Sequence, residues 1–174
     1  MDPQILMLRG VNVGGVKLPM APFREALAGL GLGRVRSYIQ SGNAVFDDPG
    51  LPDLKGAIGA MLKDKFSLTS ALFLYTPQEF SAIEAACPYA REGDEAGAKV
   101  HVFFLAEPSV LDNEGMAALA TTERFHLTAQ AFYLHAPDGI GRSVMVEKLG
   151  RFMKATTTAR NWNTVRALSE MAKL

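Results

Sequence analysis

The stretch RVRSYIQSGNAVF, residues 34–46, decides the fold. Its first half alternates, so that Val35, Ser37 and Ile39 share one face of an extended chain. The group Gln40–Asn43 then supplies turn-forming residues, and a second apolar run follows directly. Two strand-like runs joined by a Ser-Gly-Asn turn predict a β-hairpin, whose strands are neighbours in an antiparallel sheet.

The segments on either side of this hairpin predict the rest of the first sheet. Gln4–Leu8 is a short apolar run followed by glycines, which is typical of a buried strand. Apolar residues recur at helical spacing within residues 23–30 and again within 54–62, and Leu72–Tyr75 predicts a fourth strand. The order strand, helix, strand, strand, helix, strand is that of a ferredoxin-like sheet.

The second half of the chain repeats this order of elements. Strands are expected at Val100–Leu105, Phe125–Leu127, Ala131–His135 and Thr156–Thr158, with helices over Pro108–Ala120, after Ser143, and after Asn161 or Asn163. We therefore predict an α+β protein with two ferredoxin-like subdomains in tandem (the βαββαβ pattern, or alpha-beta plait) and an extra C-terminal helix.

The expected boundaries place residues 1–76 in the N-terminal subdomain and residues 99–174 in the C-terminal subdomain. Residues 77–98 form the linker between them. The linker begins with a capping-box pattern at Thr76–Glu79, which predicts a helix. It ends in Pro88–Ala98, an acidic segment with two glycines that predicts a loop.

Composition restricts the class of protein. The 174 residues carry 18 basic and 18 acidic side chains, so the net charge is zero, which argues against broad electrostatic capture of nucleic acid. Cys87 is the single cysteine, so no intramolecular disulfide can form. No apolar run approaches the roughly 20 residues that span a bilayer, and the N-terminus lacks the basic region of a secretory signal. We expect a cytoplasmic protein without a membrane partner.

The glycine-rich segment Arg9–Gly15 comes close to two phosphate-binding motifs but fits neither. Gly10 and Gly15 have the spacing of a P-loop, but Val16 stands where the lysine belongs and Lys17 comes one residue late. The segment also departs from the fingerprint of dinucleotide-binding proteins, because Asn12 stands in place of the middle glycine and no helix begins directly after it. An ordinary nucleotide triphosphatase or dehydrogenase is therefore excluded.

Topology nevertheless predicts a ligand site at this segment. In a ferredoxin-like sheet the first two strands run parallel, so the loop after the first strand and the turn after the second emerge at one edge. The candidate ligand-binding residues at this edge are Arg9, Asn12, Gly14, Gly15, Lys17, Gln40, Ser41 and Asn43. They offer donors, acceptors and positive charge beside glycine N–H groups, which suits a small polar or anionic, nucleotide-like ligand. The alternative is that they only shape and satisfy the turns.

A second polar group surrounds Trp162, the single tryptophan. We hypothesise that Arg160, Asn161 and Asn163 face the first edge across an interdomain cleft, since ligand pockets favour domain interfaces. The alternative is that this group caps the last helix and anchors Trp162 in the second core. Residues 142–174 carry seven basic and two acidic side chains, which raises RNA or other nucleic-acid binding as a further alternative.

Three segments carry a resemblance to a known family: LRGVNVGG (8–15), YIQSGN (38–43) and TTTARNWNTV (156–165). With these, the chain resembles the bacterial family catalogued as domain of unknown function 1697 over essentially its whole length. The resemblance implies two ferredoxin-like subdomains, in agreement with the order of elements, and it implies no activity.

The sequence favours a binding or regulatory module, and alternatives stay open. The same polar cluster could serve an enzyme with Arg9 as electrophile, although no nucleophile is evident; the expected role of Cys87 is that of a buried structural thiol. No His-x-x-x-His or Cys-x-x-Cys spacing predicts a metal site. The catalytic residues, if any, and the cofactor are unknown, and homodimerisation through an open sheet edge is a further alternative.

Overall fold

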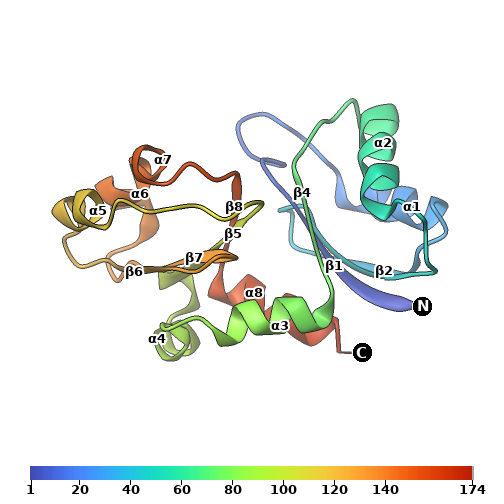
Figure 1. Cartoon of the computed structure of the whole chain (residues 1–174). Helices are drawn as coiled ribbons and strands as arrows, with labels where there is room; N and C mark the ends of the chain where they lie inside the picture. The colour runs from blue at the N-terminus through green and yellow to red at the C-terminus, as the bar shows by residue number, and fades with distance from the viewer. Residues whose placement is uncertain (174) are drawn as a thin grey trace. The chain divides into compact units, whose positions relative to one another are not determined.

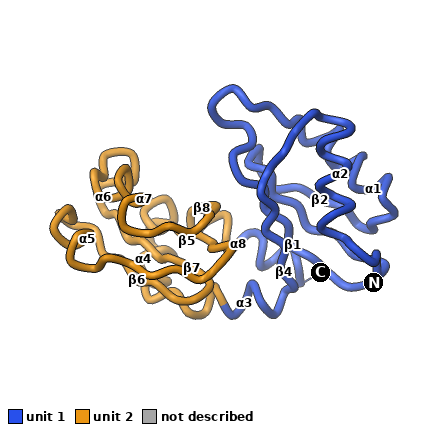
Figure 2. The backbone as a smooth tube through the Cα atoms, turned by 45° about the horizontal axis from the view of Figure 1, so that its top comes forward, with its two compact units in different colours: residues 1–82, 167–174 blue, residues 83–166 orange. Residues whose placement is uncertain are grey.

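The structure is a computed structural model that describes residues 1–173, and these residues form two four-stranded antiparallel sheets and eight α-helices. The chain divides into two compact units, Met1–Ala82 with Ala167–Leu174, and Ile83–Arg166 (Figure 2). The division falls within two helices, α3 (Pro77–Ala85) and α8 (Trp162–Met171). The predicted α+β class is confirmed.

The first unit has the predicted order of elements. It contains β1 (Asp2–Leu8), α1 (Met20–Gly29), β2 (Gly33–Tyr38), β3 (Asn43–Asp48), α2 (Leu54–Phe66) and β4 (Leu72–Tyr75) (Figure 1). The strands lie in the order β2-β3-β1-β4. Because β1 and β2 both pair antiparallel with β3, they run parallel to each other. The predicted hairpin is confirmed as β2 and β3.

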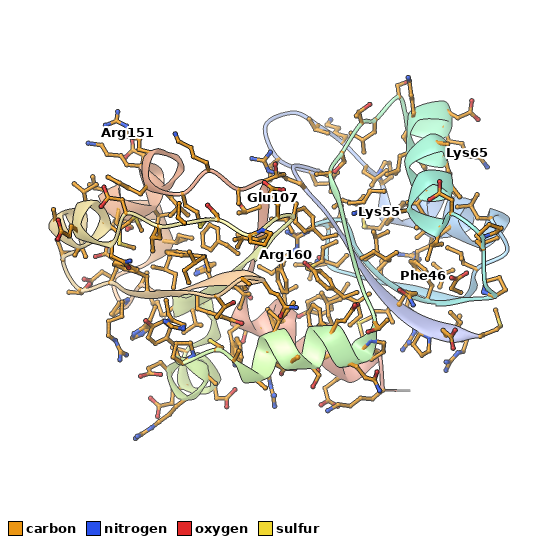
Figure 3. The ribbon with its side chains drawn as sticks, in the orientation of Figure 1. Phe46, Lys55, Lys65, Glu107, Arg151 and Arg160 are labelled. Carbon is orange, nitrogen blue, oxygen red and sulfur yellow. The ribbon has the colours of Figure 1, made fainter. Side chains whose placement is uncertain are left out.

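Helices α1 and α2 cover one face of this sheet. Leu6, Leu8 and Phe46 of the strands belong to one core with Phe23 of α1 and Ile58 of α2. Figure 3 labels Phe46. All five side chains are at most 1% exposed. The helical spacing of apolar residues in the sequence thus corresponds to the faces that meet the sheet.

The end of the last helix belongs to the first unit, whereas the expected boundary kept residues 99–174 together. In the first unit, Arg36 Nη2 of β2 donates a hydrogen bond to the carbonyl oxygen of Met171 at 2.8 Å. Periodicity predicts that a helix exists, but it carries no information about which sheet the helix packs on. The units therefore differ from the expected subdomains at the C-terminus.

The second unit repeats the strand order of the first. It contains α4 (Ala90–Glu95), β5 (Val100–Leu105), α5 (Asn113–Leu119), β6 (Arg124–Leu127), β7 (Ala131–His135), α6 (Val144–Glu147), α7 (Leu149–Phe152) and β8 (Thr157–Asn161). The strands lie in the order β6-β7-β5-β8, all antiparallel. Apolar residues of α5, α6 and α7 pack on one face of this sheet.

Two predicted segments of the second half need correction. The helix expected over Pro108–Ala120 begins only at Asn113, because the Asp112 side chain accepts from the Gly115 N–H at 3.0 Å and caps it there. The acidic loop expected over Pro88–Ala98 contains α4 and a 3₁₀ turn. Tertiary packing, described next, overrides the loop-like composition of this segment.

Trp162 explains the helix in the acidic segment. It is 2% exposed, and its Nε1 donates to Asp94 Oδ1 at 2.9 Å. A Cβ atom on Gly93 would lie 2.5 Å from Trp162 Cδ1, so α4 approaches the indole as closely as a glycine allows. Trp162 is therefore a core anchor of the second unit. Among residues 1–173, no helix combines the length and apolar character needed to cross a bilayer.

Candidate functional site

Three connections meet at one edge of the first sheet. They are the β1–α1 loop, the β2–β3 turn and the loop between α2 and β4, residues 9–19, 39–42 and 67–71. We call them together the loop edge. They meet because β1 and β2 run parallel, so both end at this edge, and β4, antiparallel to β1, begins there. Figure 1 shows the β1–α1 loop, in blue, extending beyond the end of β1.

Direct contacts hold the loop and the turn together. The Leu8 N–H donates to the Gly42 carbonyl oxygen at 2.9 Å. A Cβ atom on Gly42 would lie 2.5 Å from Val11 Cγ2, so the turn packs tightly against the loop. On the other side, the Arg9 N–H donates to the carbonyl oxygen of Ala71 at 3.1 Å. The predicted juxtaposition of Arg9–Gly15 with the β2–β3 turn is confirmed.

The loop owes its shape to residues in the left-handed region. Gly10, Gly14 and Gly15 have φ values of +73°, +58° and +86°. The Val16 N–H donates to the Val13 carbonyl oxygen at 3.1 Å and closes a tight turn around Gly14 and Gly15, as in a type I′ turn. A Cβ atom on any of the three glycines would meet nothing within 4 Å. Conformation, not crowding, requires glycine here, and the backbone stays open to approach.

Asn12 holds this shape from within. Its Oδ1 accepts from the Leu18 N–H at 2.8 Å, and its Nδ2 donates to the Leu18 carbonyl oxygen at 2.9 Å. It adopts φ +56°, which asparagine tolerates better than most residues. Leu18 itself is fully buried in the core under α1. Asn12, expected as a ligand contact, therefore clamps the two ends of the loop together.

The loop presents donors that the rest of the protein does not use. Within residues 1–173, the backbone N–H groups of residues 10–15 donate to no protein acceptor. Arg9 and Lys17, at the two ends of this segment, are exposed, and neither side chain forms an ion pair or hydrogen bond within the same described residues. Unpaired N–H groups beside unpaired cations are the chemistry of an anion site.

The β2–β3 turn contributes less than its sequence predicted. Asn43 is 0% exposed, and its Nδ2 donates to the Tyr38 carbonyl oxygen at 3.2 Å, so it closes the hairpin. Ser41 is half-buried, whereas Gln40 is exposed. Gln40 is thus the exposed polar side chain that this turn offers to a ligand.

The C-terminal polar group lies in the second unit. Arg160 of β8 donates through Nη1 to Thr158 Oγ1 at 2.7 Å, and burial lowers the pKa of its guanidinium to about 10. Asn161 caps α8, because its Oδ1 accepts from the Thr164 N–H at 3.1 Å. Asn163 is exposed at the first turn of α8. A site shared with the loop edge stays a prediction.

A polar cluster in the second unit escaped the sequence patterns. Arg124 Nη2 lies 2.8 Å from Glu92 Oε1 and 3.0 Å from His135 Nδ1, and Arg124 Cζ lies 5.1 Å from the centre of the Tyr89 ring. The hydrogen bond from Arg124 lowers the pKa of the Glu92 carboxyl. Tyr89 directly precedes α4, whereas Glu92, Arg124 and His135 lie in α4, β6 and β7, so no local spacing predicts the cluster. They satisfy one another and join α4 to the sheet.

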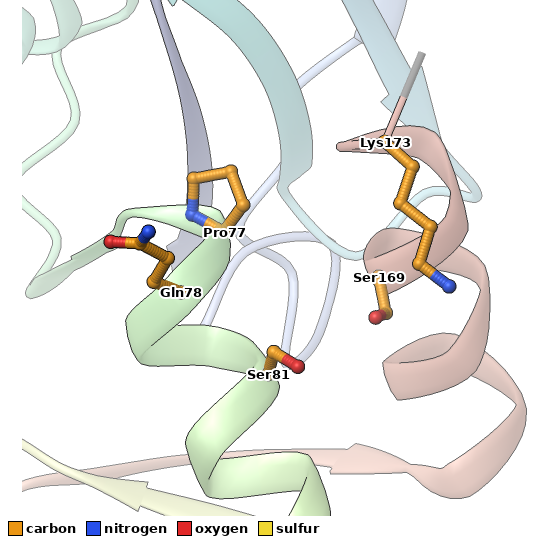
Figure 4. Close-up of a pocket in the computed structure, with 5 residues that line it drawn as sticks. All are labelled: Pro77, Gln78, Ser81, Ser169 and Lys173. Atoms are coloured by element: carbon orange, nitrogen blue, oxygen red, sulfur yellow. The ribbon is translucent and has the colours of Figure 1, made fainter.

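Two surface pockets lie elsewhere in the first unit. One of about 380 Å³ is lined by Pro77, Gln78, Ser81, Ser169 and Lys173 (Figure 4). Its one cation, Lys173 Nζ, is already bound to Glu170 Oε1 at 2.7 Å. Another, of about 470 Å³, lies between α1 and α2 and is lined mainly by alanine, glycine and leucine or methionine. Among residues 1–173, no three His, Cys, Asp or Glu side chains gather to hold a metal ion.

Comparison with known proteins assigns the family. Residues 1–133 match the family described as "Protein of unknown function (DUF1697)". The chain belongs to this family. The match includes the entire loop edge of the DUF1697 chain, whereas the polar segment 156–165 lies beyond it.

One solved structure supports the architecture of this DUF1697 protein. The conserved bacterial protein SP0830 from Streptococcus pneumoniae is similar at 23% sequence identity and a TM-score of 0.73. The similarity covers 100% of this chain and 99% of that one, so it extends over both units. At this identity the likeness concerns the fold. No curated protein matches the chain.

Proposed function

We propose that this DUF1697 protein is a binding module that takes the anionic group of a small ligand at the loop edge. The observation that carries the proposal is the run of six unpaired backbone N–H groups, residues 10–15, between Arg9 and Lys17. A phosphate group suits such a site best, because it offers several strong acceptor oxygens and a charge of up to two.

Each residue of the loop edge has a role in this proposal. Arg9 and Lys17 supply positive charge, Arg9 through a planar fork that can contact two oxygens and Lys17 as a point charge. Gly14 and Gly15 let the anion approach the backbone, because they carry no Cβ. The Asn12 side chain keeps the N–H groups in place through its bonds to Leu18 and does not itself contact the ligand.

The alternatives receive less support. As a nucleophile for an enzyme, Cys87 is unsuited, because burial raises the pKa of its thiol to about 11. RNA binding on a sheet of this kind uses exposed aromatic side chains on central strands. Here Phe46, Phe104 and Tyr133 are each 0% exposed. The basic segment 142–174 stays the one argument for nucleic acid.

We infer that each unit is a ferredoxin-like subdomain. The strand orders β2-β3-β1-β4 and β6-β7-β5-β8, with helices between the first and second and the third and fourth strands of each unit, support this class. A cytoplasmic location stays a prediction, supported by the single buried cysteine.

Isothermal titration calorimetry with inorganic phosphate, at low ionic strength, tests the proposed function. Arg9→Ala should weaken binding by about 10- to 150-fold, the scale of a charged hydrogen bond. The control is Arg151→Ala, which removes an exposed arginine from α7 in the other unit (Figure 3) and should leave the affinity unchanged. Equal losses in both variants, or no binding by the unaltered protein, would refute the proposal.

A further inference from the structure

The loop edge also exposes apolar side chains. Val13, Val16 and Ile39 are 62%, 39% and 52% exposed. Among residues 1–173, the other large hydrophobic side chains exposed to this degree are Met1, Val110 and Val144, which lie outside the loop edge. Half of the exposed large hydrophobic residues thus occur in the same short connections as the unpaired donors.

The fold does not require these apolar residues. None of the three belongs to the core under α1 and α2. Ile39 moreover adopts φ +49°, a conformation that a β-branched residue rarely takes and that glycine or asparagine would adopt with less strain. Apolar side chains that stay 39–62% exposed at one edge of the fold indicate a surface that another molecule covers.

The position of the valines in the loop indicates what that molecule is. Val13 and Val16 enclose Gly14 and Gly15 in the tight turn closed by the 3.1 Å hydrogen bond between them. Apolar side chains therefore border the glycine backbone to which an anion would bind. A ligand that fills both environments must carry an apolar group directly beside its anionic group.

We propose that the ligand is an organic phosphate ester whose apolar substituent lies against Val13 and Val16. The phosphate contacts the N–H groups of the exposed residues Gly10, Val13, Gly14 and Gly15, and the substituent covers the two valines. This inference rests on the proposed function, since it extends the same site. A free ester and the headgroup of a phospholipid such as phosphatidic acid share this chemistry.

The test is a series of inorganic, methyl, ethyl and butyl phosphate, with affinities from amide chemical shifts in ¹⁵N-labelled protein. Each added methylene should tighten binding roughly two- to fourfold, the upper figure being that of full burial. The variant Val16→Thr, at a residue outside the phosphate-binding run 10–15, keeps the branched shape but should reduce this gain while leaving inorganic phosphate affinity unchanged. The control is Val110→Thr, which alters a valine outside the loop edge that is 87% exposed. This control should keep the full gain in affinity from inorganic to butyl phosphate.

The outcomes separate the two proposals. If inorganic phosphate perturbs residues 10–15 but butyl phosphate binds no tighter, this inference fails and the proposed function stands. If no phosphate compound perturbs these residues, both fail. Vesicles of phosphatidylcholine, with and without phosphatidic acid, then distinguish the sources of a tight-binding ester: cosedimentation that requires phosphatidic acid identifies a lipid headgroup, and its absence identifies a soluble ester.

Discussion

Replacing Gly42 by alanine tests whether the β2–β3 turn and the β1–α1 loop pack as tightly as the structure indicates. Gly42 has φ +73°, and a Cβ atom there would lie 2.5 Å from Val11 Cγ2 and 2.9 Å from Leu8 Cβ. The left-handed backbone costs alanine about 1–2 kcal/mol. The steric overlap adds about 1–3 kcal/mol, the usual cost of overpacking a core. Gly42→Ala should therefore lower the free energy of unfolding of the first unit by about 2–5 kcal/mol.

Gly50→Ala is the matched control for this prediction. Gly50 also has a positive φ, +98°, but a Cβ atom there would meet nothing within 4 Å. Gly50→Ala should thus lower the free energy of unfolding only by the cost of the left-handed backbone, about 1–2 kcal/mol. Native-state hydrogen exchange of the backbone amides that pair β1 with β3 measures the free energy of unfolding of the first unit on its own. This separation is needed because the two units need not unfold together. Equal losses in the two variants would show that the turn is not packed against Val11 and Leu8.

Two further predictions concern hydrogen bonds in the two units. Asn12→Ala removes both hydrogen bonds to Leu18 and should lower the free energy of unfolding of the first unit by about 1–3 kcal/mol, as measured by hydrogen exchange. It should also weaken the binding of inorganic phosphate, because the loop loses its clamp. Unchanged stability would contradict the role of Asn12. Burial alone would raise the pKa of Glu123, but hydrogen bonds from Ser143 and Thr121 outweigh it and lower that pKa from 4.5 to about 2. A carboxyl group whose pKa is lower in the folded than in the unfolded protein stabilises the fold at pH values above its unfolded pKa. The melting temperature of the unaltered protein should therefore exceed that of Glu123→Gln by a constant amount above pH 4.5, and by less and less as the pH falls towards 2. A difference in melting temperature that does not depend on pH would argue against this role of Glu123.

The sequence was most informative where a local pattern determines structure, although it missed the local Asp112 cap of α5. The hairpin over residues 34–46 follows from the alternating pattern and the turn residues. The helix caps follow from single side chains: Ser143 Oγ accepts a hydrogen bond from the Val146 N–H at 3.2 Å. The side chains of Thr76 and Glu79 each accept a hydrogen bond from the backbone N–H of the other residue, as in a capping box. These interactions span three residues, so the sequence contains both partners side by side.

Long-range packing was beyond the reach of such patterns. The helix over Ala90–Glu95 forms in an acidic segment with two glycines because Gly93 meets Trp162, which comes far later in the chain. The end of α8 joins the first unit through Met171 and Arg36, a pairing that no periodicity encodes. Both cases depend on a partner that is distant in sequence.

The meeting of the β1–α1 loop with the β2–β3 turn was predicted, but not the role of each residue there. Topology brought the loop and the turn together correctly. Composition, however, could not distinguish polar groups used within the fold, such as those of Asn12 and Asn43, from the ones left free, such as those of Arg9 and Lys17. That distinction depends on hydrogen-bond partners, which only the three-dimensional structure supplies.

The most direct measurement is a titration of ¹⁵N-labelled protein with inorganic phosphate, followed through the backbone amides. Phosphate bound at the loop edge should shift the amide signals of residues 10–15, among them Gly10, Gly14 and Gly15, on one common saturation curve. The amide of Arg151, in the other unit, should not follow that curve. Signals of residues 10–15 that stay in place while phosphate saturates another part of the chain, or that never move, would contradict an anion site in this loop.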